Sequence, residues 1–598
     1  MATKKELAQL SLYVYNVPAD AEQKNRPNLP SSDWVVLEYS PDNTLGFSYG
    51  IFKNNSTGEV VVAYTGSNEK LVVDFLLTNI PAGVGVGSTQ ISGAAVVAAR
   101  TIQTYGAQNV SFTGHSLGGG LASIMSVWFN RPAVVFDHAP FELAARNPLF
   151  VQASKLALAL QGYPLGDFLG YNEFLNFATR ELNVQGHHIQ GEALQYLRSA
   201  VPTIGGSQSL TVGQGLGTVE MHSMALYVAA ELSPSFVQAT LLSDRFLPRI
   251  FDDKLYAYDA AGSADRNFLI DLIRSEQQTP GSGKLTHFAA DLNKLGTNLT
   301  GLNQQAQDAI IAQGIEWYYF QSSSYSGAEF MTVTNSVLQY TTATGAALPA
   351  ALNKAGKYTD KWLTSLVAPN TQYGLSINFD QWNVVTANTA ATVTAKDNTK
   401  SQIFIGGAGA DNFTGGDKAD TFIAGDGADS LTGGAGGDFL YGGAGNDSYT
   451  FSGTFGDDTI VDSDGAGIIS VDSTTLNGGK KIGENVWEST DGVYRYQLFS
   501  RGGGNDLVIG RGSKATTGQM QGSGQALQKL LLNQKQTIEL MHELGADLIQ
   551  NLLKTPQNGF NIPEMGILRL PKASCARAKR WRGDLMQVRP RSRVGRCA

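Results

Sequence analysis

Short apolar runs and amphipathic segments alternate over the first 230 residues of the chain. Runs rich in β-branched and aromatic residues predict strands at residues 34–39, 58–64, 110–115, 133–136 and 182–190. Apolar residues at helical spacing predict helices at residues 4–15 and 86–105, and a further helix directly after residue 116. Strands that alternate with helices in this way favour an α/β fold with parallel strands and right-handed crossovers.

The pattern is less regular in three other segments. Residues 141–181 are partly helical and show no strand pattern, so they form either a lid or acyl-binding insertion, or ordinary covering helices. Residues 230–400 predict helix and loop, with a linker or edge strands at residues 386–401. Amphipathic spacing predicts another helix at residues 523–554.

An abrupt turn from strand to helix is predicted at Ser116. The residue at such an apex has strained backbone geometry, so its neighbours Gly114 and Gly118 avoid clashes and its side chain projects outward. A hydroxyl held there can attack an acyl carbon if an imidazole takes its proton, and the N–H of Leu117 would then point at the oxyanion. The G-x-S-x-G pattern alone is weak evidence in a chain with 68 glycines. The strand before it and the helix after it favour a nucleophile over a structural turn.

Composition limits the class of protein. With 598 residues, the chain is too long for one hydrophobic core, so two or three domains are expected. The net charge is −8, but residues 572–598 carry nine Lys or Arg and one Asp, so the rest of the chain carries −16. An acidic body disfavours nucleic acid as a partner and suits an extracellular protein or one that loads divalent cations. The only cysteines, Cys575 and Cys597, lie in the basic tail, so the body forms no disulfide and no thiolate metal site.

Two motifs resemble the class three lipases. They are VVAYTGS at residues 61–67, followed by Asp74-Phe75-Leu76, and GHSLGG at residues 114–119. The resemblance covers residues 30–230 and implies an α/β-hydrolase domain that cleaves lipid esters, with Ser67 as the second oxyanion donor. Thr65 departs from the arginine that is usual in the family, which affects the local charge network but not the backbone donor. The alternative for Ser67 is an ordinary turn serine.

Chain order helps to identify the general base. Hydrolases of this fold present the serine, then the acid, then the histidine. His222 follows the last predicted strand and resembles the family's histidine, so it is expected to take the proton, with His287 as the fallback. The other histidines fit less well: His115 is expected to point away from Ser116, His138 comes too early, His187 and His188 are adjacent at a strand end, and His542 lies beyond the repeats.

Three carboxylates compete for the role of the acid that orients this histidine. Glu192 lies where the family's usual aspartate follows its strand, so glutamate is a departure from the family. Asp137 follows the preceding strand and is the main competitor, and Asp167 is the third candidate. Either residue type can orient an imidazole and stabilise the imidazolium, so the choice among them stays open.

From Gly406 the chain repeats every nine residues over five consecutive units. Glycines turn the chain in each unit, and an apolar residue at position eight fills a thin core. The aspartates at position six are Asp411, Asp420, Asp429, Asp438 and Asp447. Stacked carboxylates with turn carbonyls form an oxygen cage that suits Ca²⁺, whereas bare rows of carboxylates would repel one another. The block resembles the RTX parallel β-roll of proteins exported by the type I secretion machinery, so the roll is expected to fold where calcium is abundant, outside the cell.

The ends of the chain carry opposing signals about location. The first residues lack the apolar segment of a Sec signal peptide, and no run of roughly 18 apolar residues exists, which alone favours the cytoplasm. The RTX resemblance reverses this expectation and implies a secreted, extracellular protein. Residues 572–598 do not resemble a secretion signal; they are either foreign to the fold, which we favour, or an anchor for anionic lipid.

Together these features predict an α/β-hydrolase (lipase-like) domain with helical insertions at residues 1–395 and an all-β RTX roll with capping strands at residues 396–515. A helical region follows at residues 516–571, and the basic tail lies outside the fold. The expected protein is a Ca²⁺-dependent extracellular triacylglycerol lipase or phospholipase A1 that acts on lipid esters at an interface. The alternatives are an RTX adhesin or toxin whose α/β domain only binds, and a polyesterase or cutinase-like enzyme.

Overall fold

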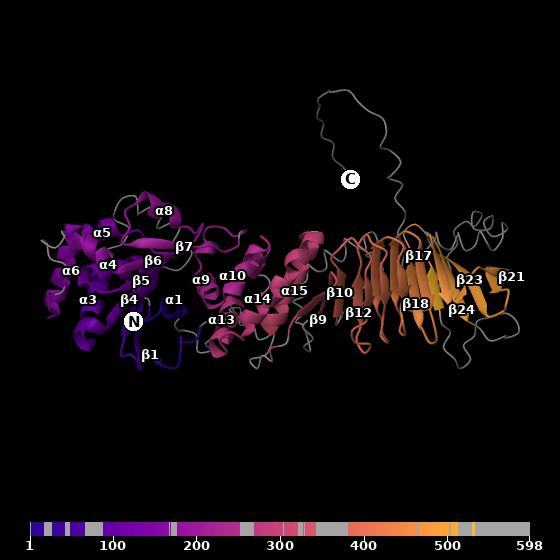
Figure 1. Cartoon of the computed structure of the whole chain (residues 1–598), viewed down its shortest axis with the longest axis horizontal. Helices are drawn as coiled ribbons and strands as arrows, with labels where there is room; N and C mark the ends of the chain where they lie inside the picture. Colours follow the sequence, from indigo (N-terminus) through magenta and orange to yellow (C-terminus); the bar gives the residue numbers. More distant parts are fainter. Residues whose placement is uncertain are drawn as a thin grey trace, which may run out of the picture.

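An α/β part, a helical part and a β-rich part follow one another along the long axis of the molecule (Figure 1). The computed structural model describes residues 2–16, 27–41, 48–65, 88–166, 168, 176–213, 215–251, 268–302, 304–320, 327, 329–341, 381–462, 464, 466–501, 504–511 and 529–532. Among the helices in these ranges, none has the length and apolarity needed to cross a bilayer.

A seven-stranded sheet forms the centre of the α/β part, and its strands lie in sequence order. They are β1 (Trp34–Ser40), β2 (Tyr49–Asn54), β3 (Val60–Tyr64), β4 (Val110–His115), β5 (Ala133–Phe136), β6 (Val184–Ile189) and β7 (Gly206–Leu210). The β1–β2 and β2–β3 pairs are antiparallel, and all later pairs are parallel. The predicted α/β fold is therefore confirmed. The sequence pattern missed β2, and it missed β7 because this edge strand is polar and exposed and lacks an apolar run.

Helices cover both faces of this sheet, which explains why β3 and β4 are buried along their whole length. On one face lie α1 (Lys4–Tyr13) and α9 (Met224–Leu232), and on the other lie α3 (Ser88–Tyr105) and α4 (Leu117–Phe129). Every residue of α4 is buried, as expected for a helix that is apolar on all sides. The segment predicted as a lid or covering helices contains α5 (Glu142–Arg146), α6 (Pro148–Leu160) and α7 (Phe177–Glu181), and α8 (Gln195–Ala200) follows β6.

A helical part connects the α/β sheet to the β-rich part. Its helices are α10 (Pro234–Leu241), α11 (Phe246–Ile250), α13 (Phe268–Gln278), α14 (Lys284–Leu295) and α15 (Gln304–Phe320). One apolar cluster runs from α1 and α9 through these helices to Trp382 and Ile403 in the first strands of the β-rich part. The three parts thus share a continuous core.

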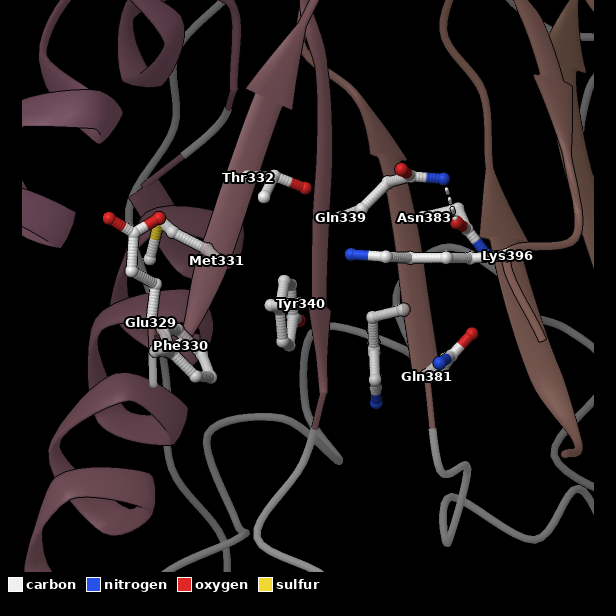
Figure 2. Close-up of a pocket in the computed structure, with 10 residues that line it drawn as sticks. Glu329, Phe330, Met331, Thr332, Gln339, Tyr340, Gln381, Asn383 and Lys396 are labelled. Atoms are coloured by element: carbon white, nitrogen blue, oxygen red, sulfur yellow. Dashed lines mark hydrogen bonds between the residues drawn. The ribbon is translucent and has the colours of Figure 1, made fainter. Parts of the chain in front are cut away.

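A small cavity lies where the helical part meets the β-rich part (Figure 2). Tyr340, Gln381 and Lys396 line it, and the nearby Gln339 side chain donates a hydrogen bond to Asn383 Oδ1 at 2.8 Å. The cavity volume is about 50 Å³, which is room for a few water molecules but not for a lipid chain. The polar groups at this junction therefore serve the packing rather than the binding of a lipid.

Two sheets face each other in the β-rich part. One consists of β11 (Thr392–Thr394), β13 (Asn412–Thr414), β15 (Ser430–Thr432), β17 (Asp447–Phe451), β19 (Gly467–Val471) and β20 (Thr474–Thr475). The other consists of β8 (Met331–Thr334), β9 (Val337–Thr341), β10 (Gln381–Val385), β12 (Gln402–Ile405), β14 (Thr421–Asp426), β16 (Phe439–Ala444), β18 (Asp457–Val461), β21 (Gly479–Gly483), β22 (Val486–Ser489), β23 (Tyr494–Arg501), β24 (Gly504–Arg511) and β25 (Lys529–Leu532).

The register of these strands is that of a parallel β-roll. Phe404 pairs with Phe422, and Phe422 pairs with Leu440, so each coil uses two nine-residue repeats, one for each sheet. The apolar residue at position eight of each repeat points between the sheets, where the Phe404 and Phe422 rings stack with their centroids 4.7 Å apart. The predicted roll is confirmed, and strands β18 and β21 to β24, in the segment expected to cap it, belong to the same sheet as its strands.

The structure changes two sequence expectations at the ends of the roll. Strands β8 to β11 already pair within the two roll sheets, so these sheets begin before the domain boundary expected at residue 396. The helix predicted at residues 523–554 is wrong at residues 529–532, which form β25 between β18 and β24. Leucine favours helices, but backbone pairing on both sides of a strand outweighs this local propensity. The other residues of that predicted helix lie outside the described residues.

Candidate active site and calcium sites

Ser116 lies at a tight turn between β4 and α4. Its backbone angles, φ +59° and ψ −127°, are strained for a residue with a side chain. The turn is held on both sides, because the Ser116 N–H donates to Phe136 O at 3.0 Å and its carbonyl accepts from the N–H groups of Gly120 and Ala139. Leu117 is the first residue of α4, where N–H groups have no partner within the helix. This is the strand, turn and helix that the sequence predicts.

The two glycines of the motif allow the backbones to approach closely. A Cβ atom on Gly118 would lie 2.1 Å from the carbonyl oxygen of Tyr64, and one on Gly114 would lie 2.6 Å from the backbone of Gly118. Any side chain at these positions would push α4 away from the end of β3. The glycines are therefore required to place Ser116 at the carboxyl edge of the sheet, where ligands bind in open α/β folds.

His222 and Glu192 form a buried pair at the same edge. His222 ends a 3₁₀ turn (Glu220–His222) just before α9, and its Nδ1 lies 2.6 Å from Glu192 Oε2. A carboxylate can only accept here, so Nδ1 carries the proton and Nε2 keeps its lone pair. Within the described part of the chain, neither His222 Nε2 nor the buried Ser116 Oγ has a hydrogen-bond partner. The site therefore holds an unused acceptor and an unused hydroxyl.

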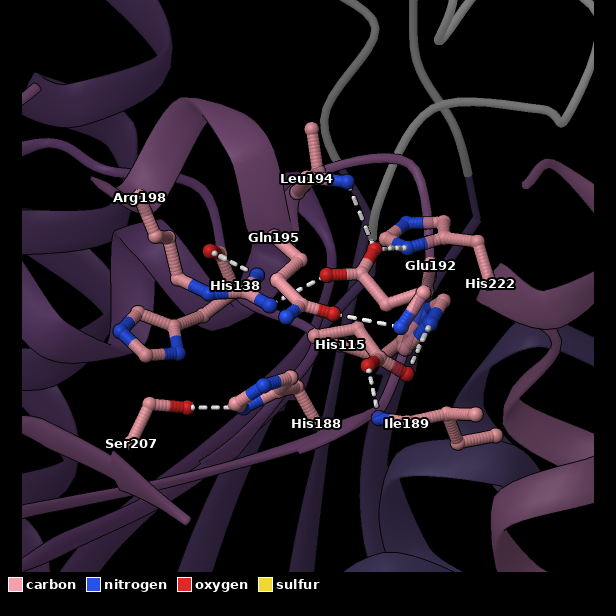
Figure 3. Close-up of polar contacts among 12 residues, drawn as sticks. His115, His138, His188, Ile189, Glu192, Leu194, Gln195, Arg198, Ser207 and His222 are labelled. Carbon is pink, nitrogen blue, oxygen red and sulfur yellow. Dashed lines mark hydrogen bonds and ion pairs between the residues drawn. The ribbon is translucent and has the colours of Figure 1, made fainter. Parts of the chain in front are cut away.

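Glu192 is fully buried and satisfied by three partners, as Figure 3 shows. Besides His222, its carboxylate accepts from the Leu194 N–H at 2.7 Å and forms an ion pair with Arg198. Burial alone would raise the pKa of Glu192, but the hydrogen bond from His222, the charges of His222 and Arg198 and the Leu194 N–H lower it on balance. Glu192 is thus held ionised beside His222, which suits the role of the orienting acid.

Asp137 pairs with a different histidine. It follows β5 with a positive φ of 43°, and its Oδ1 accepts from the Ile189 N–H at 2.9 Å. Its Oδ2 lies 3.5 Å from His115 Nε2. The ring of His115 packs against that of His222 with centroids 4.6 Å apart. Asp137 therefore reaches the same site from the next strand, but its closest histidine is His115.

The remaining sequence candidates are distributed as follows. Ser67 and Asp167 lie outside the described residues. His287 lies on α14 in the helical part, where its Nε2 is near Gly327, far along the chain from the serine turn. His188 Nδ1 bonds the Ser207 hydroxyl at 2.7 Å, and His187 packs against Phe136. None of these three is joined by a described contact to Ser116.

Two residues of the site were missed by the sequence reasoning. Arg198 balances the buried charge of Glu192 and also donates to His138 O at 3.1 Å. Its position six residues after Glu192, on a helix that follows the turn, was the only available signal. The hydroxyl of Tyr15 lies 2.9 Å from His115 Nδ1, although the two residues are 100 positions apart in the sequence. No local pattern connects them.

The aspartates at position six of the repeats form two ladders inside the roll. In each, Oδ1 of one aspartate accepts the backbone N–H of the aspartate one coil earlier: Asp429 from Asp411 at 2.7 Å, Asp438 from Asp420 at 2.8 Å and Asp447 from Asp429 at 3.0 Å. The spacing is 18 residues, so neighbours in sequence lie on opposite sheets. Among the described residues, Oδ2 of Asp429, Asp438 and Asp447 is buried without a partner.

These carboxylates fit a calcium site. The unpartnered Oδ2 atoms are hard oxygen ligands, and a Cβ on Gly433 or Gly442 would lie 2.3 Å from the Oδ2 of Asp438 or Asp447. Glycine at the first position thus leaves room for the aspartate of its own repeat. Asp458 continues the ladder, accepting from the Asp438 N–H at 2.8 Å. The sequence analysis missed it because two extra residues interrupt the nine-residue period, although Gly456-Asp457-Asp458-Thr459-Ile460 keeps the glycine, aspartate and apolar positions.

We expect the calcium-free roll to lose stability as the pH rises. Burial raises the pKa of Asp438 to about 8, of Asp458 to about 7, and of Asp420, Asp429 and Asp447 to about 6. The unfolded chain releases these protons near pH 4, so between about pH 4 and pH 8 the folded roll binds more protons than the unfolded one. Circular dichroism of the full chain in chelator should show the roll melting at a lower temperature at pH 8 than at pH 5.5.

Excess calcium should remove this dependence, because the cation stabilises the ionised form and displaces the protons. Asp397→Asn is the matched control and should keep the pH dependence of the wild-type melting temperature. This aspartate lies outside the ladders, and its hydrogen bonds from Thr399 lower its pKa. A calcium-free melting temperature that rises over the same pH interval would contradict the proposed role of the buried carboxyls.

Comparison with known proteins gives two family matches. Residues 6–245 match the Tle-like phospholipase domain, and residues 405–440 and 414–449 match the RTX calcium-binding nonapeptide repeat. No curated protein matches the chain. Among solved structures, Lip2 lipase from Yarrowia lipolytica is 13% identical with a TM-score of 0.22 and covers 36% of this chain and 78% of its own. The extracellular lipase LipA from Serratia marcescens is 11% identical with a TM-score of 0.16 and covers 89% and 94%.

Proposed function

We propose that this chain, which joins a Tle-like phospholipase domain to RTX calcium-binding repeats, is a secreted serine hydrolase of lipid esters. The combination of a lipase-like α/β domain with RTX repeats is the one expected from the sequence. The phospholipase match favours phospholipid over triacylglycerol as the substrate class, and phospholipase A1-type cleavage is the reaction we assign. The observation that carries the proposal is the buried His222–Glu192 pair at the carboxyl edge of the sheet that also presents Ser116.

In this proposal Ser116 Oγ attacks the acyl carbon while His222 Nε2 takes its proton. Glu192 holds the imidazole by its Nδ1–H and stabilises the imidazolium that forms. The N–H of Leu117, together with that of Ser67, holds the negative charge on the carbonyl oxygen. His222 then returns the proton to the leaving alcohol, and a water molecule repeats the sequence on the acyl-enzyme to release the fatty acid.

The roll supplies the dependence on calcium. Asp411, Asp420, Asp429, Asp438 and Asp447, with Asp458, are the ligands we propose, and they supply oxygen atoms that only a bound cation or protons can neutralise. A roll that bound calcium stabilises is less stable before the chain leaves the cell, where calcium is scarce, which fits export by the type I secretion machinery. Extracellular location and this partner are part of the proposal.

The substrate class is tested with the calcium-loaded full chain and three esters: a phosphatidylcholine labelled in its sn-1 chain, a triacylglycerol emulsion and a p-nitrophenyl acyl ester. We expect labelled fatty acid to be released from the phospholipid, and the rate to fall when calcium is chelated. Hydrolysis of triacylglycerol alone would identify a lipase instead. A folded, calcium-loaded protein that is inert on all three esters would favour a binding module, such as an RTX adhesin or toxin, over an enzyme.

A further inference from the structure

A group of three potential metal ligands lies at the serine turn. One ligand atom each from His115, Asp137 and His222 can be chosen so that all three atoms lie within 4.8 Å of one another. His115 and Asp137 are 5% and 0% exposed, and the side chain of His222 is 8% exposed. Only His222 is used by the mechanism proposed above. His115 and Asp137 come from the ends of β4 and β5, so the sheet itself fixes their positions.

With His115 protonated at Nδ1, the buried side-chain atoms of this group that have no described hydrogen-bond partner are all acceptors. Tyr15 Oη lies 2.9 Å from His115 Nδ1 and 3.1 Å from the carbonyl oxygen of His115. When Tyr15 donates its hydrogen to this carbonyl, Nδ1 carries the ring proton and donates to Tyr15. The lone pair of His115 is then on Nε2, which faces Asp137 Oδ2 at 3.5 Å. His222 likewise keeps its lone pair on Nε2. In the described part of the chain, none of these three atoms has a hydrogen-bond partner.

In this tautomer, three buried acceptors gathered in one group are unfavourable unless something positive is bound. A metal cation satisfies the same three atoms without protonating either ring. The group therefore has the properties of a cation site with nitrogen ligands.

We propose that His115, Asp137 and His222 bind Zn²⁺, and that bound Zn²⁺ blocks the hydrolase. Two imidazoles and one carboxylate form a common zinc ligand set, with the fourth position open to water. Zinc–ligand bonds of 2.0–2.2 Å place the ligand atoms of a tetrahedral site about 3.3 Å apart. His115 Nε2 and Asp137 Oδ2 are already close to this separation at 3.5 Å, and the ligand atoms of the whole group lie within 4.8 Å, so binding requires the group to close around the ion.

The hydrogen-bond partners of these three ligands support their assignment to a zinc site. A metal-bound histidine usually donates its second N–H to a carboxylate or another oxygen, which fixes the ring and its tautomer. Here Glu192 accepts from His222, and the Tyr15 hydroxyl lies 2.9 Å from His115 Nδ1, where it can accept the N–H of a metal-bound ring. The second oxygen of Asp137 is held by the Ile189 N–H. All three ligands are thus oriented before any ion arrives.

The inhibitory effect rests on the proposed function, whereas binding does not. Zinc coordinated to His222 Nε2 occupies the lone pair that would accept the proton of Ser116, so the serine could no longer be activated. The calcium sites of the roll offer only oxygen ligands and remain filled in excess calcium. Zinc added under these conditions therefore reports on the nitrogen site.

Binding is measured with Co²⁺ as a spectroscopic probe for the zinc site, added to the calcium-loaded full chain in excess Ca²⁺. We expect one equivalent of Co²⁺ with the visible absorption of a four-coordinate site, and its displacement by Zn²⁺. His115→Gln and Asp137→Asn should each weaken binding at least about tenfold. His188→Gln replaces a neighbouring histidine outside the group and should leave the affinity unchanged.

Circular dichroism of each variant establishes that it folds, and two substituted positions keep the test valid if one variant does not. Wild-type protein that takes up no Co²⁺ at millimolar concentration, or His115→Gln and Asp137→Asn variants that bind as tightly as wild type, would overturn the proposal. Inhibition of ester hydrolysis should follow the same Zn²⁺ titration and be weaker in these two variants. If the protein binds Co²⁺ but hydrolyses no ester even without Zn²⁺, the site stands and the proposed function fails.

Discussion

Replacement of Ser116 by alanine is expected to lower kcat for ester hydrolysis by roughly 10⁴-fold to 10⁶-fold, without unfolding the protein. The loss is large because the variant has no atom that can form the acyl-enzyme, and His222 and Glu192 have no substitute hydroxyl to activate. The hydroxyl contributes little to stability, since Ser116 Oγ has no hydrogen-bond partner within the described residues. Initial rates on a p-nitrophenyl ester, with a thermal melt of each protein, test both parts of the prediction.

Ser123→Ala is the matched control for this experiment. Ser123 is buried on the same helix, α4, and its hydroxyl donates to Gly119 O at 2.9 Å. Its removal should change the free energy of unfolding by about 1 kcal/mol and leave kcat near the wild-type value. A Ser116→Ala variant that keeps wild-type rates would exclude Ser116 as the nucleophile and with it the proposed mechanism.

The parts of the fold that could be predicted are those determined by local sequence. The apolar runs of β3 and β4 and the glycines around Ser116 carry their own signals, because burial on both faces and a tight turn each restrict residue type. The nine-residue period likewise defines the roll. Strands β2, β7, β8, β9, β10 and β25 were not predicted. An exposed edge strand such as β7 lacks an apolar run, and β25 depends on partners that are distant in sequence.

In the candidate site, too, local sequence predicts some features, whereas others depend on contacts between distant residues. Ser116, His222 and the competing carboxylates follow from motif and chain order, but the pairing of each carboxylate with a histidine does not. It depends on how far each side chain reaches across the strand ends: Glu192 meets His222, while Asp137 meets His115. The contact of Tyr15 with His115 joins the N-terminal segment to the serine turn over 100 residues. Such contacts exist only once the sheet has formed.

Glu192→Gln is expected to lower kcat by roughly 10³-fold to 10⁴-fold, whereas Asp137→Asn should lower it by no more than about tenfold. A glutamine at position 192 can donate to His222 Nδ1 and so place the imidazole proton on the wrong nitrogen, and it cannot stabilise the imidazolium. Among the described hydrogen bonds and ion pairs, those of His222 involve Glu192 and not Asp137, whose nearest histidine is His115, so the charge of Asp137 acts less directly on His222. Rates measured in chelated, zinc-free buffer with saturating calcium compare the two variants directly.

Stability has to be separated from catalysis in this comparison, because Glu192→Gln also leaves the buried Arg198 without its carboxylate. Breaking a buried pair in this way costs about 3–5 kcal/mol, so the variant should melt at a lower temperature. Glu192→Asp restores the charge on a shorter side chain and should recover part of kcat if the carboxylate acts on His222. If Asp137→Asn instead shows the larger loss while Glu192→Gln only destabilises the fold, Asp137 is the acid, and Glu192 serves to neutralise Arg198.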